Sequence, residues 1–254
     1  MSSVVALSTT PVKGTRLRTV DAVELTAQGA RGDRRFYVID DRGLMVNGKI
    51  VGELQSVVAD AQDGSLSLTF PDGEIVSGEV APGASVTTRF FSRPREAHLV
   101  PGPFSEALSE HCGRTLRLVE PSTGAIDRGR GGATSLISVA SLARLAEAAG
   151  EDAVDARRFR MLFEVDGLEA HAEDAWVGQR VQIGDATVRF RGHVGRCLIT
   201  SRDPDTGVVD LPTLDILGDY RADLETTEPL PFGIYGEVVA EGRVRVGDPV
   251  VPLG

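Results

Sequence analysis

The sequence is poor in cysteine and contains no long apolar segment. Its 254 residues include two cysteines, Cys112 and Cys197, and two thiols so far apart in the chain do not make a disulfide framework. No apolar run approaches the roughly 20 residues that a membrane-spanning helix needs. Residues 1–11 lack the basic start and apolar core of a secretion signal. We therefore expect a cytoplasmic protein with reduced thiols and no membrane association.

Several common binding signatures are also missing. The sequence has no CxxC or HExxH metal motif, no Walker-type phosphate loop and no dinucleotide fingerprint. The glycine-rich stretch 129–132 lacks the strand–turn–helix context of a phosphate loop, so we expect a turn there. The histidines show no ligand spacing, and each is expected to be a surface or hydrogen-bonded side chain: His98, His111, His171 and His193.

Basic residues are fewer than acidic ones. The chain has 27 Lys and Arg against 37 Asp and Glu, a formal net charge of −10, which argues against nucleic acid as a partner. Hydrophobic residues make up 41% of the sequence and charged residues 25%, as in ordinary globular proteins. The length suits one large domain or two smaller ones.

Short apolar or alternating stretches, separated by Gly and Asp turns, predict many short strands. These stretches occupy residues 20–25, 36–39, 44–46, 66–70, 75–76, 86–90, 181–183, 186–190, 234–239, 243–246 and 250–251. Gly184-Asp185 is expected to turn a hairpin. Short strands at such close spacing are typical of barrels and sandwiches.

Two segments have helical periodicity instead. Residues 103–111 carry apolar side chains on one face, and residues 138–149 do the same before Gly150, a helix stop signal. Cys112 follows the first helix and is expected to be a small core residue. The single Trp176 is expected to serve packing. We therefore predict an α+β protein, mostly β, with a few attached helices.

Cys197 offers the most distinctive chemistry. It ends an apolar strand-like run beside Arg196, and an Asp-Pro-Asp-Thr-Gly turn follows at residues 203–207. A thiolate suits a soft metal, and a neighbouring guanidinium favours the thiolate form. Taken alone, however, a thiol ending an apolar run is more typical of a buried core residue.

Basic residues cluster in three other short motifs. Lys13 lies in Pro-Val-Lys-Gly, Arg34 in Gly-Asp-Arg-Arg-Phe, and Arg160 in Arg-Arg-Phe-Arg. If they converged on one cleft, these side chains would bind an anionic ligand by charge-assisted hydrogen bonds. Each motif taken singly is more typical of solvated charges at a strand end.

In order along the chain, these motifs resemble those of MOSC-domain proteins of the amidoxime-reducing component family. Residues 11–14, 25–29 and 32–36 resemble the N-terminal β-barrel domain of that family. The motifs that resemble the MOSC domain itself lie in residues 172–178, 196–200, 203–207, 214–221 and 246–250. The resemblance implies an N-terminal β-barrel domain over residues 1–120 and a MOSC-type β-barrel over residues 121–254, with a weakly marked boundary near residues 120–124.

The resemblance implies a molybdenum cofactor, that is, molybdopterin carrying one metal, bound between the domains. Cys197 matches the family's molybdenum ligand, and thiolate sulfur suits such a metal. The expected cofactor contacts are Lys13, Gly14, Thr15, Arg34, Arg160, Asp174 and Arg196. Asp174 could equally orient an Arg or cap a turn. Pyridoxal phosphate binding is a further expectation from the resemblance.

The activity that the resemblance implies is reduction of small N-hydroxylated, amidoxime-like compounds. Two electrons and two protons would be consumed and water released, with Cys197 and Arg196 as the catalytic residues. Arg196 is expected to orient the substrate or stabilise developing charge. No cysteine cluster could hold iron and sulfur. We therefore expect a separate electron-donor protein of the flavoprotein, ferredoxin or cytochrome type.

Two departures from the family pattern leave alternatives open. Leu162 stands where the family often has Asn, and Gly195, two residues before Cys197, offers no hydroxyl. A sulfur carrier or cofactor-binding protein on the same fold, with Cys197 as a persulfide and an altered pterin site, is one alternative. A scaffold without catalysis is another.

Overall fold

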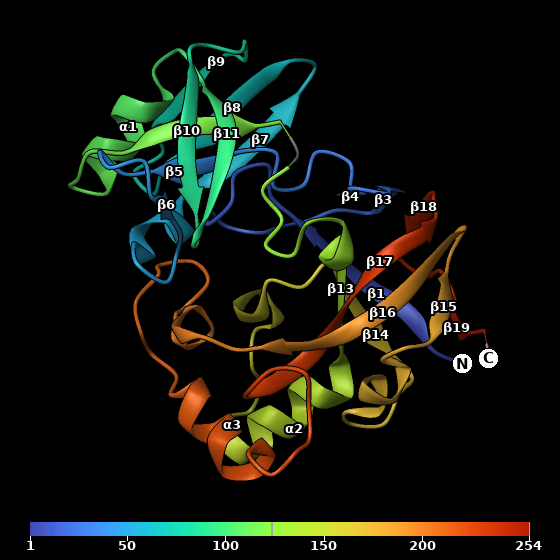
Figure 1. Cartoon of the computed structure of the whole chain (residues 1–254). Helices are drawn as coiled ribbons and strands as arrows, with labels where there is room; N and C mark the ends of the chain where they lie inside the picture. The colour runs from blue at the N-terminus through green and yellow to red at the C-terminus, as the bar shows by residue number, and fades with distance from the viewer. Residues whose placement is uncertain (123, 254) are drawn as a thin grey trace.

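The computed structural model describes residues 1–122 and 124–253, and strands dominate it (Figure 1). Figure 1 shows two lobes, one holding β5 to β12 with α1 and the other holding a large sheet with α2 and α3. This α+β, mostly β architecture confirms the fold class predicted from the sequence. The expected domain boundary near residues 120–124 includes Thr123, which lies outside the described residues, and the division into 1–120 and 121–254 stays a prediction.

The large sheet has eight strands and curls around its own core (Figure 1). In spatial order the strands are β19 (Val250–Pro252), β15 (Arg180–Ile183), β16 (Ala186–Gly195), β17 (Pro231–Ala240), β13 (Thr134–Ser138), β14 (Phe163–Asp166), β1 (Ser3–Thr9) and β2 (Arg18–Thr19). Neighbours pair antiparallel except β13 and β14, which are parallel. The first strand of the chain, β1, therefore pairs with β14, which comes from far along the sequence.

Three smaller sheets complete the structure. Their strands, in spatial order, are β10 (Ser85–Phe90), β11 (Arg93–Leu99), β12 (Arg117–Pro121), β5 (Tyr37–Ile39) and β6 (Met45–Val46); β7 (Val58–Gln62), β8 (Ser65–Thr69) and β9 (Ile75–Glu79); and β18 (Gly242–Arg245), β3 (Ala22–Thr26) and β4 (Gly29–Ala30). Pairing of β18 with β3 joins the end of the chain to its beginning.

The described residues form the α-helices α1 (Phe104–His111), α2 (Val139–Ala149) and α3 (Thr213–Arg221), and the short 3-10 helices η1 (Gly52–Ser56), η2 (Gly129–Gly132), η3 (Ala156–Phe159), η4 (Ala172–Trp176) and η5 (Leu198–Ser201). Both helices predicted from periodicity are confirmed. The hydroxyl of Ser138 caps α2 by accepting from the Ser141 N–H, and Gly150 ends it at φ 70°. In the described ranges, no helix has the length and apolar character to cross a membrane.

The two lobes have separate apolar cores. Phe36, Phe104 and Leu54 centre one core, and Phe163 and Phe190 belong to the core of the large sheet. Both expectations for single packing residues hold. Trp176 stacks on Phe190 with ring centroids 6.2 Å apart, and Cys112 packs against the first of these cores. Burial raises the pKa of the Cys112 thiol to about 12, so this cysteine is a poor nucleophile and metal ligand.

Candidate functional site

A cavity of about 310 Å³ lies where residues from the two halves of the chain meet. Six of the residues expected at the cofactor site line it: Lys13, Gly14, Arg34, Arg160, Arg196 and Cys197. Of these six residues, Lys13, Gly14 and Arg34 lie in the loops after β1 and β4. Arg160 directly follows η3, and Arg196 and Cys197 directly follow β16. The motifs that are scattered through the sequence therefore face one space.

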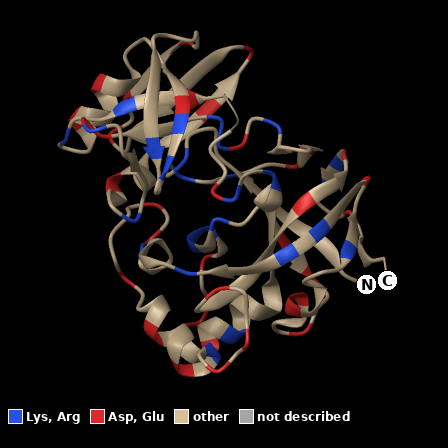
Figure 2. Cartoon of the chain, viewed as in Figure 1, with Lys and Arg blue, Asp and Glu red and all other residues tan. Residues whose placement is uncertain are grey.

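Positive charge dominates the cavity. Among the described residues, the lining includes six basic side chains, those of Lys13, Arg34, Lys49, Arg128, Arg160 and Arg196, and two carboxylates, those of Asp33 and Asp127. Figure 2 shows basic segments from both lobes around the middle of the molecule. The whole chain has a net charge of −10, so this local excess of positive charge is distinctive, and it suits an anionic ligand.

The turn after β1 brings Lys13 into the cavity wall. Its backbone N–H donates to the Phe36 carbonyl at 2.8 Å, and its Nζ forms a hydrogen-bonded ion pair with Asp127. Burial lowers the pKa of Lys13, and Arg34 and Arg160 lower it further, while Asp127 opposes the change. Burial would raise the pKa of Asp127, but the charge and hydrogen bond of Lys13, together with the charges of Arg34 and Arg128, outweigh burial and lower the pKa. The pair keeps a desolvated amine at the cavity surface.

Arg34 and Arg160 are held together although both are cationic. Arg34 Nη2 donates to the carbonyl of Arg160 at 2.8 Å, and Arg160 Nη2 donates to the carbonyl of Thr15 at 2.8 Å. Both backbones lie in the left-handed region, at φ 47° and 56°, which non-glycine residues rarely adopt. Burial lowers the pKa of Arg160 to about 9, and the charge of Arg34 adds to this. An anion between the two guanidinium groups would offset the desolvation of Arg160 and the repulsion between the two positive charges.

Cys197 is exposed and lines the cavity, so the expectation of a buried core thiol, made from its apolar neighbours, is wrong. The residue has extended backbone and begins η5, where its carbonyl accepts from the N–H and the hydroxyl of Thr200, each at 3.0 Å. The chain therefore leaves β16 and turns at Cys197, and the thiol is presented to the cavity instead of the core.

The guanidinium of Arg196 is fixed beside that thiol. Its Nε donates to the Phe232 carbonyl at 2.8 Å and its Nη1 to the Phe159 carbonyl at 2.9 Å. Burial lowers the pKa of Arg196 to about 9, while Cys197 raises it. The side chain is therefore a charge anchored on two backbone carbonyls at the cavity wall.

Two expected cofactor contacts lie outside the cavity lining. Thr15 is fully buried, its hydroxyl donates to the Val12 carbonyl at 2.7 Å, and it reaches the site only through the carbonyl that accepts from Arg160. Asp174 lies in η4 and accepts from Arg221 Nη2 at 2.6 Å. The structure therefore places Asp174 as the partner of an arginine in α3.

The two departures from the family pattern have different surroundings. Leu162 lines the cavity but is buried in the core of the large sheet. Gly195 donates its N–H to Glu228 Oε2 at 2.9 Å, and a Cβ built on it would lie 2.8 Å from the same oxygen. Arg128 holds Glu228 in turn, with Nη2 at 2.7 and 2.6 Å from the two carboxylate oxygens. Glycine at 195 is therefore required by the position of Glu228.

Sequence reasoning missed several residues of the wall. Asp127 and Arg128 come directly before the stretch 129–132, which forms η2 as the expected turn and also contributes Gly132 to the lining. Phe91, at the tip of the β10–β11 hairpin, lines the cavity with its side chain about half exposed. The glycine-rich loop with its flanking charges was the one signal in the sequence for this part of the wall.

Comparison with known proteins gives matches over nearly the whole chain. The family model for the MOSC domain matches residues 123–251, and that for the MOSC N-terminal beta barrel domain matches residues 1–99. Mitochondrial amidoxime-reducing component 1 of Mus musculus is 27% identical over 278 residues, which covers 96% of this chain and 80% of the relative. Mitochondrial amidoxime reducing component 2 of Bos taurus is 27% identical over 283 residues, covering 96% and 81%. Among solved structures, the YUAD protein from Bacillus subtilis aligns with 98% of this chain and 94% of its own, at 12% identity and a TM-score of 0.48.

Proposed function

Because this chain belongs to the MOSC domain family and carries the MOSC N-terminal β-barrel domain, we propose that it is a molybdenum-cofactor-dependent reductase of small N-hydroxylated, amidoxime-like compounds. The names of two relatives that align with 96% of the chain support this reaction class. The observation that carries the proposal is the exposed thiol of Cys197 in a cavity lined by basic side chains from both halves of the chain.

The residues of the cavity fit a cofactor that joins an anionic phosphate to a soft metal. Lys13, Arg34 and Arg160 would hold the phosphate by charge-assisted hydrogen bonds. Cys197 would ligate molybdenum, since thiolate sulfur suits a soft, redox-active metal. Leu162 offers only an apolar surface, so other polar groups of the wall must hold the pterin ring. When bound, the cofactor supplies the two-electron redox chemistry of the reaction.

The residues of this chain bind, orient and stabilise charge. Arg196 cannot swing freely because two backbone carbonyls hold it, so its charge keeps a fixed place in the cavity wall. The same fixed charge faces the cavity and would stabilise negative charge that develops on the substrate. The half-exposed ring of Phe91 adds an apolar contact for a small organic substrate.

Reduction of an N–OH group to N–H consumes two electrons and two protons and releases water. We propose that a separate protein of the flavoprotein, ferredoxin or cytochrome type supplies the electrons. Pyridoxal phosphate binding and a cytoplasmic location stay predictions from the sequence.

Elemental analysis tests the cofactor assignment directly. Wild type, Cys197→Ser and Cys112→Ala would be purified from cells that make the molybdenum cofactor. Wild type and Cys112→Ala are expected to contain molybdenum and to reduce benzamidoxime with a chemically reduced viologen dye. Cys197→Ser should lose the activity and most of the metal, because it removes the ligand. Wild-type protein without molybdenum, or full activity in Cys197→Ser, would overturn the proposal.

A second function is favoured by two observations, the exposed thiol of Cys197 and the apolar Leu162 at the cavity wall. On this alternative the protein is a sulfur carrier or cofactor-binding protein, and Cys197 carries sulfur as a persulfide. Intact-mass measurement separates the two functions. A sulfur adduct that is lost on treatment with reductant, and is missing from Cys197→Ser, favours the carrier.

A further inference from the structure

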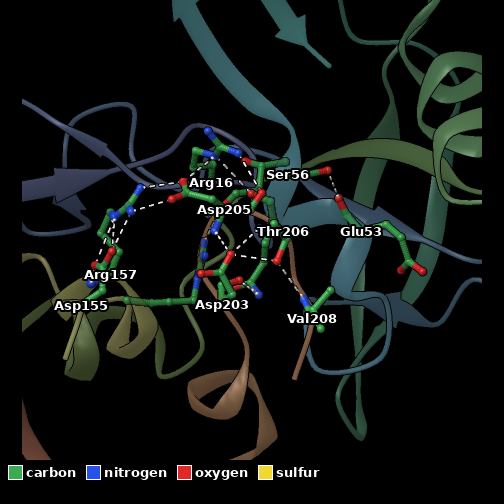
Figure 3. Close-up of polar contacts among 12 residues, drawn as sticks. Arg16, Glu53, Ser56, Asp155, Arg157, Asp203, Asp205, Thr206 and Val208 are labelled. Atoms are coloured by element: carbon green, nitrogen blue, oxygen red, sulfur yellow. Dashed lines mark hydrogen bonds and ion pairs between the residues drawn. The ribbon is translucent and has the colours of Figure 1, made fainter. Parts of the chain in front are cut away.

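The carboxylate of Asp205 binds two arginines that come from opposite halves of the chain (Figure 3). Arg157 donates from Nη1 and Nη2 to the two carboxylate oxygens, both at 2.8 Å. Arg16 approaches from the other side, with Nε 3.2 Å from Oδ1 and Nη2 donating to the Asp205 carbonyl at 2.7 Å. One acidic residue of the turn 203–207 thus bridges the two halves.

Each of these arginines lies close in sequence to a cation of the cavity. Arg16 directly follows Thr15, whose carbonyl accepts from Arg160, and it belongs to the same turn as Lys13. Arg157 begins the segment that ends at Arg160, the C-cap of η3. Asp205 therefore connects the backbone segment that carries Lys13 to the segment that carries Arg160, through its contacts with Arg16 and Arg157.

The turn that carries Asp205 is itself rigid. Asp203 Oδ1 accepts from the N–H of Asp205 at 3.1 Å and from the N–H and hydroxyl of Thr206 at 2.7 and 2.8 Å. A Cβ on Gly207 would lie 1.9 Å from the Gly52 carbonyl oxygen, so the turn meets η1 backbone to backbone. Gln55, which is fully buried in η1, donates to the Asp203 carbonyl at 3.4 Å.

The turn also continues directly from the thiol segment. Cys197 begins η5, and Arg202, which follows η5, donates from Nη1 to the Gly207 carbonyl at 2.6 Å and from Nη2 to the Lys49 carbonyl at 3.3 Å. Three segments that line the cavity, those of Lys13, Arg160 and Cys197, are thus anchored on the turn 203–207.

We propose that Asp205 is a positioning residue that fixes the separation of Lys13 and Arg160 and thereby sets the affinity of the cavity for a phosphate-type anion. The inference rests on the anion-binding part of the proposed function. Asp205 is 41% exposed in its side chain, and ion pairs so open to solvent contribute little to stability. The bidentate pair with Arg157 fixes geometry more than it adds energy. Loss of the carboxylate should therefore change anion affinity more than it changes folding.

The chain contains a matched control. Arg158, next to Arg157 in η3, donates to both oxygens of Asp210, each at 2.6 Å, and the side chain of Asp210 is 39% exposed. The two carboxylates have the same chemistry and nearly the same exposure, although the Arg158 side chain is 10% exposed and that of Arg157 is 30% exposed. Both partners of the Arg158–Asp210 pair belong to the second half. Asp210→Asn thus removes a bidentate ion pair of η3 without removing a bridge between the halves.

The experiment is calorimetric titration of the purified chain, free of cofactor, with inorganic pyrophosphate. Asp205→Asn is expected to weaken pyrophosphate binding about tenfold, because Lys13 and Arg160 keep their charges but not their separation. Asp205→Glu is expected to restore part of the lost affinity. Asp210→Asn should bind within about twofold of wild type, and both Asn variants should melt within a few degrees of it. Lys13→Met serves as the positive control and should bind weakest.

The outcomes separate this inference from the proposed function. Equal weakening by Asp205→Asn and Asp210→Asn, or wild-type affinity in Asp205→Asn, would overturn it. So would a Lys13→Met variant that binds like wild type, since the cavity would then not be the anion site. If Asp205→Asn fails to fold, Arg16→Gln removes the first-half arm of the bridge, with the same expected loss. Weakened pyrophosphate binding in Asp205→Asn together with a molybdenum-free wild type would uphold the positioning role and reject the cofactor assignment.

Discussion

Arg34 Nη2 donates a hydrogen bond to the carbonyl of Arg160 across 126 positions of sequence. The two residues also share an unusual backbone conformation, with φ at 47° and 56°. A protein does not gain folding stability by bringing two buried guanidinium groups together on strained backbone. The Asp33 carboxylate pairs with Arg34, and an anion bound between the two guanidinium groups would offset the remaining positive charge.

Replacing Arg160 by Met should separate folding from binding. The variant loses a buried charge whose pKa burial lowers to about 9, so its thermal midpoint without ligand should be equal to or higher than that of wild type. Its pyrophosphate affinity should fall at least tenfold, because the charge-assisted hydrogen bond from Arg160 to the anion is lost. Thermal melts with and without pyrophosphate measure both quantities. A lower midpoint with unchanged affinity would show that Arg160 serves folding alone.

Acid should destabilise the protein through His171. Both ring nitrogens are buried without a hydrogen-bond partner in the described part of the chain, and burial, then Arg221, lowers the pKa of His171 from 6.5 to about 4. The unfolded chain therefore binds this proton more readily, and stability is lost as the pH falls from about 6.5 to about 4.

The measurement for His171 is urea unfolding at several pH values. His171→Asn removes the titrating ring and tolerates the left-handed backbone of this residue, at φ 64°. Its free energy of unfolding should fall less steeply between pH 6.5 and 4 than that of wild type. His98→Gln serves as the control for the loss of one histidine elsewhere in the chain. Parallel slopes for His171→Asn and wild type would contradict the prediction.

Gly195→Ala should displace the Glu228 carboxylate. The added methyl would lie 2.8 Å from Oε2, and overpacking of this kind typically costs about 1–3 kcal/mol. Gly131→Ala is the matched control, because a Cβ there meets nothing within 4 Å, and its cost should stay below about 1 kcal/mol. Chemical denaturation gives both values. Equal costs for the two variants would mean that Glu228 moves aside freely.

Local rules predicted part of this fold well. The two helices found from periodicity lie where expected because a capping Ser138 and the glycine stops act within one turn of chain. α3 was seen only as a motif, since two of its three buried positions are polar, Thr213 and Arg221. The pairing of β1 with β14 was not foreseen at all, because no local signal marks a partner so distant in sequence.

The sequence predicted the main basic and thiol residues of the candidate site, but not the residues that form hydrogen bonds and ion pairs with them. Lys13, Arg34, Arg160 and Cys197 were found through the motifs of the family, and all line one cavity. Asp127 was missed because its role depends on Lys13, 114 positions away. The local sequence alone favoured a buried Cys197, because the apolar run before it is strand and the change of direction into η5 leaves no mark in the sequence.

Strands from both ends of the chain belong to the lobe of the large sheet. β1 completes the large sheet beside β14, and β18 completes the sheet of β3. A fragment that begins at residue 121 would present β14 as a bare sheet edge, and one that stops at residue 120 would leave β3 without β18. Strands β1 to β4 are thus part of the large-sheet lobe, and the lobe that holds β5 to β12 is an insertion between β4 and β13 of the other lobe.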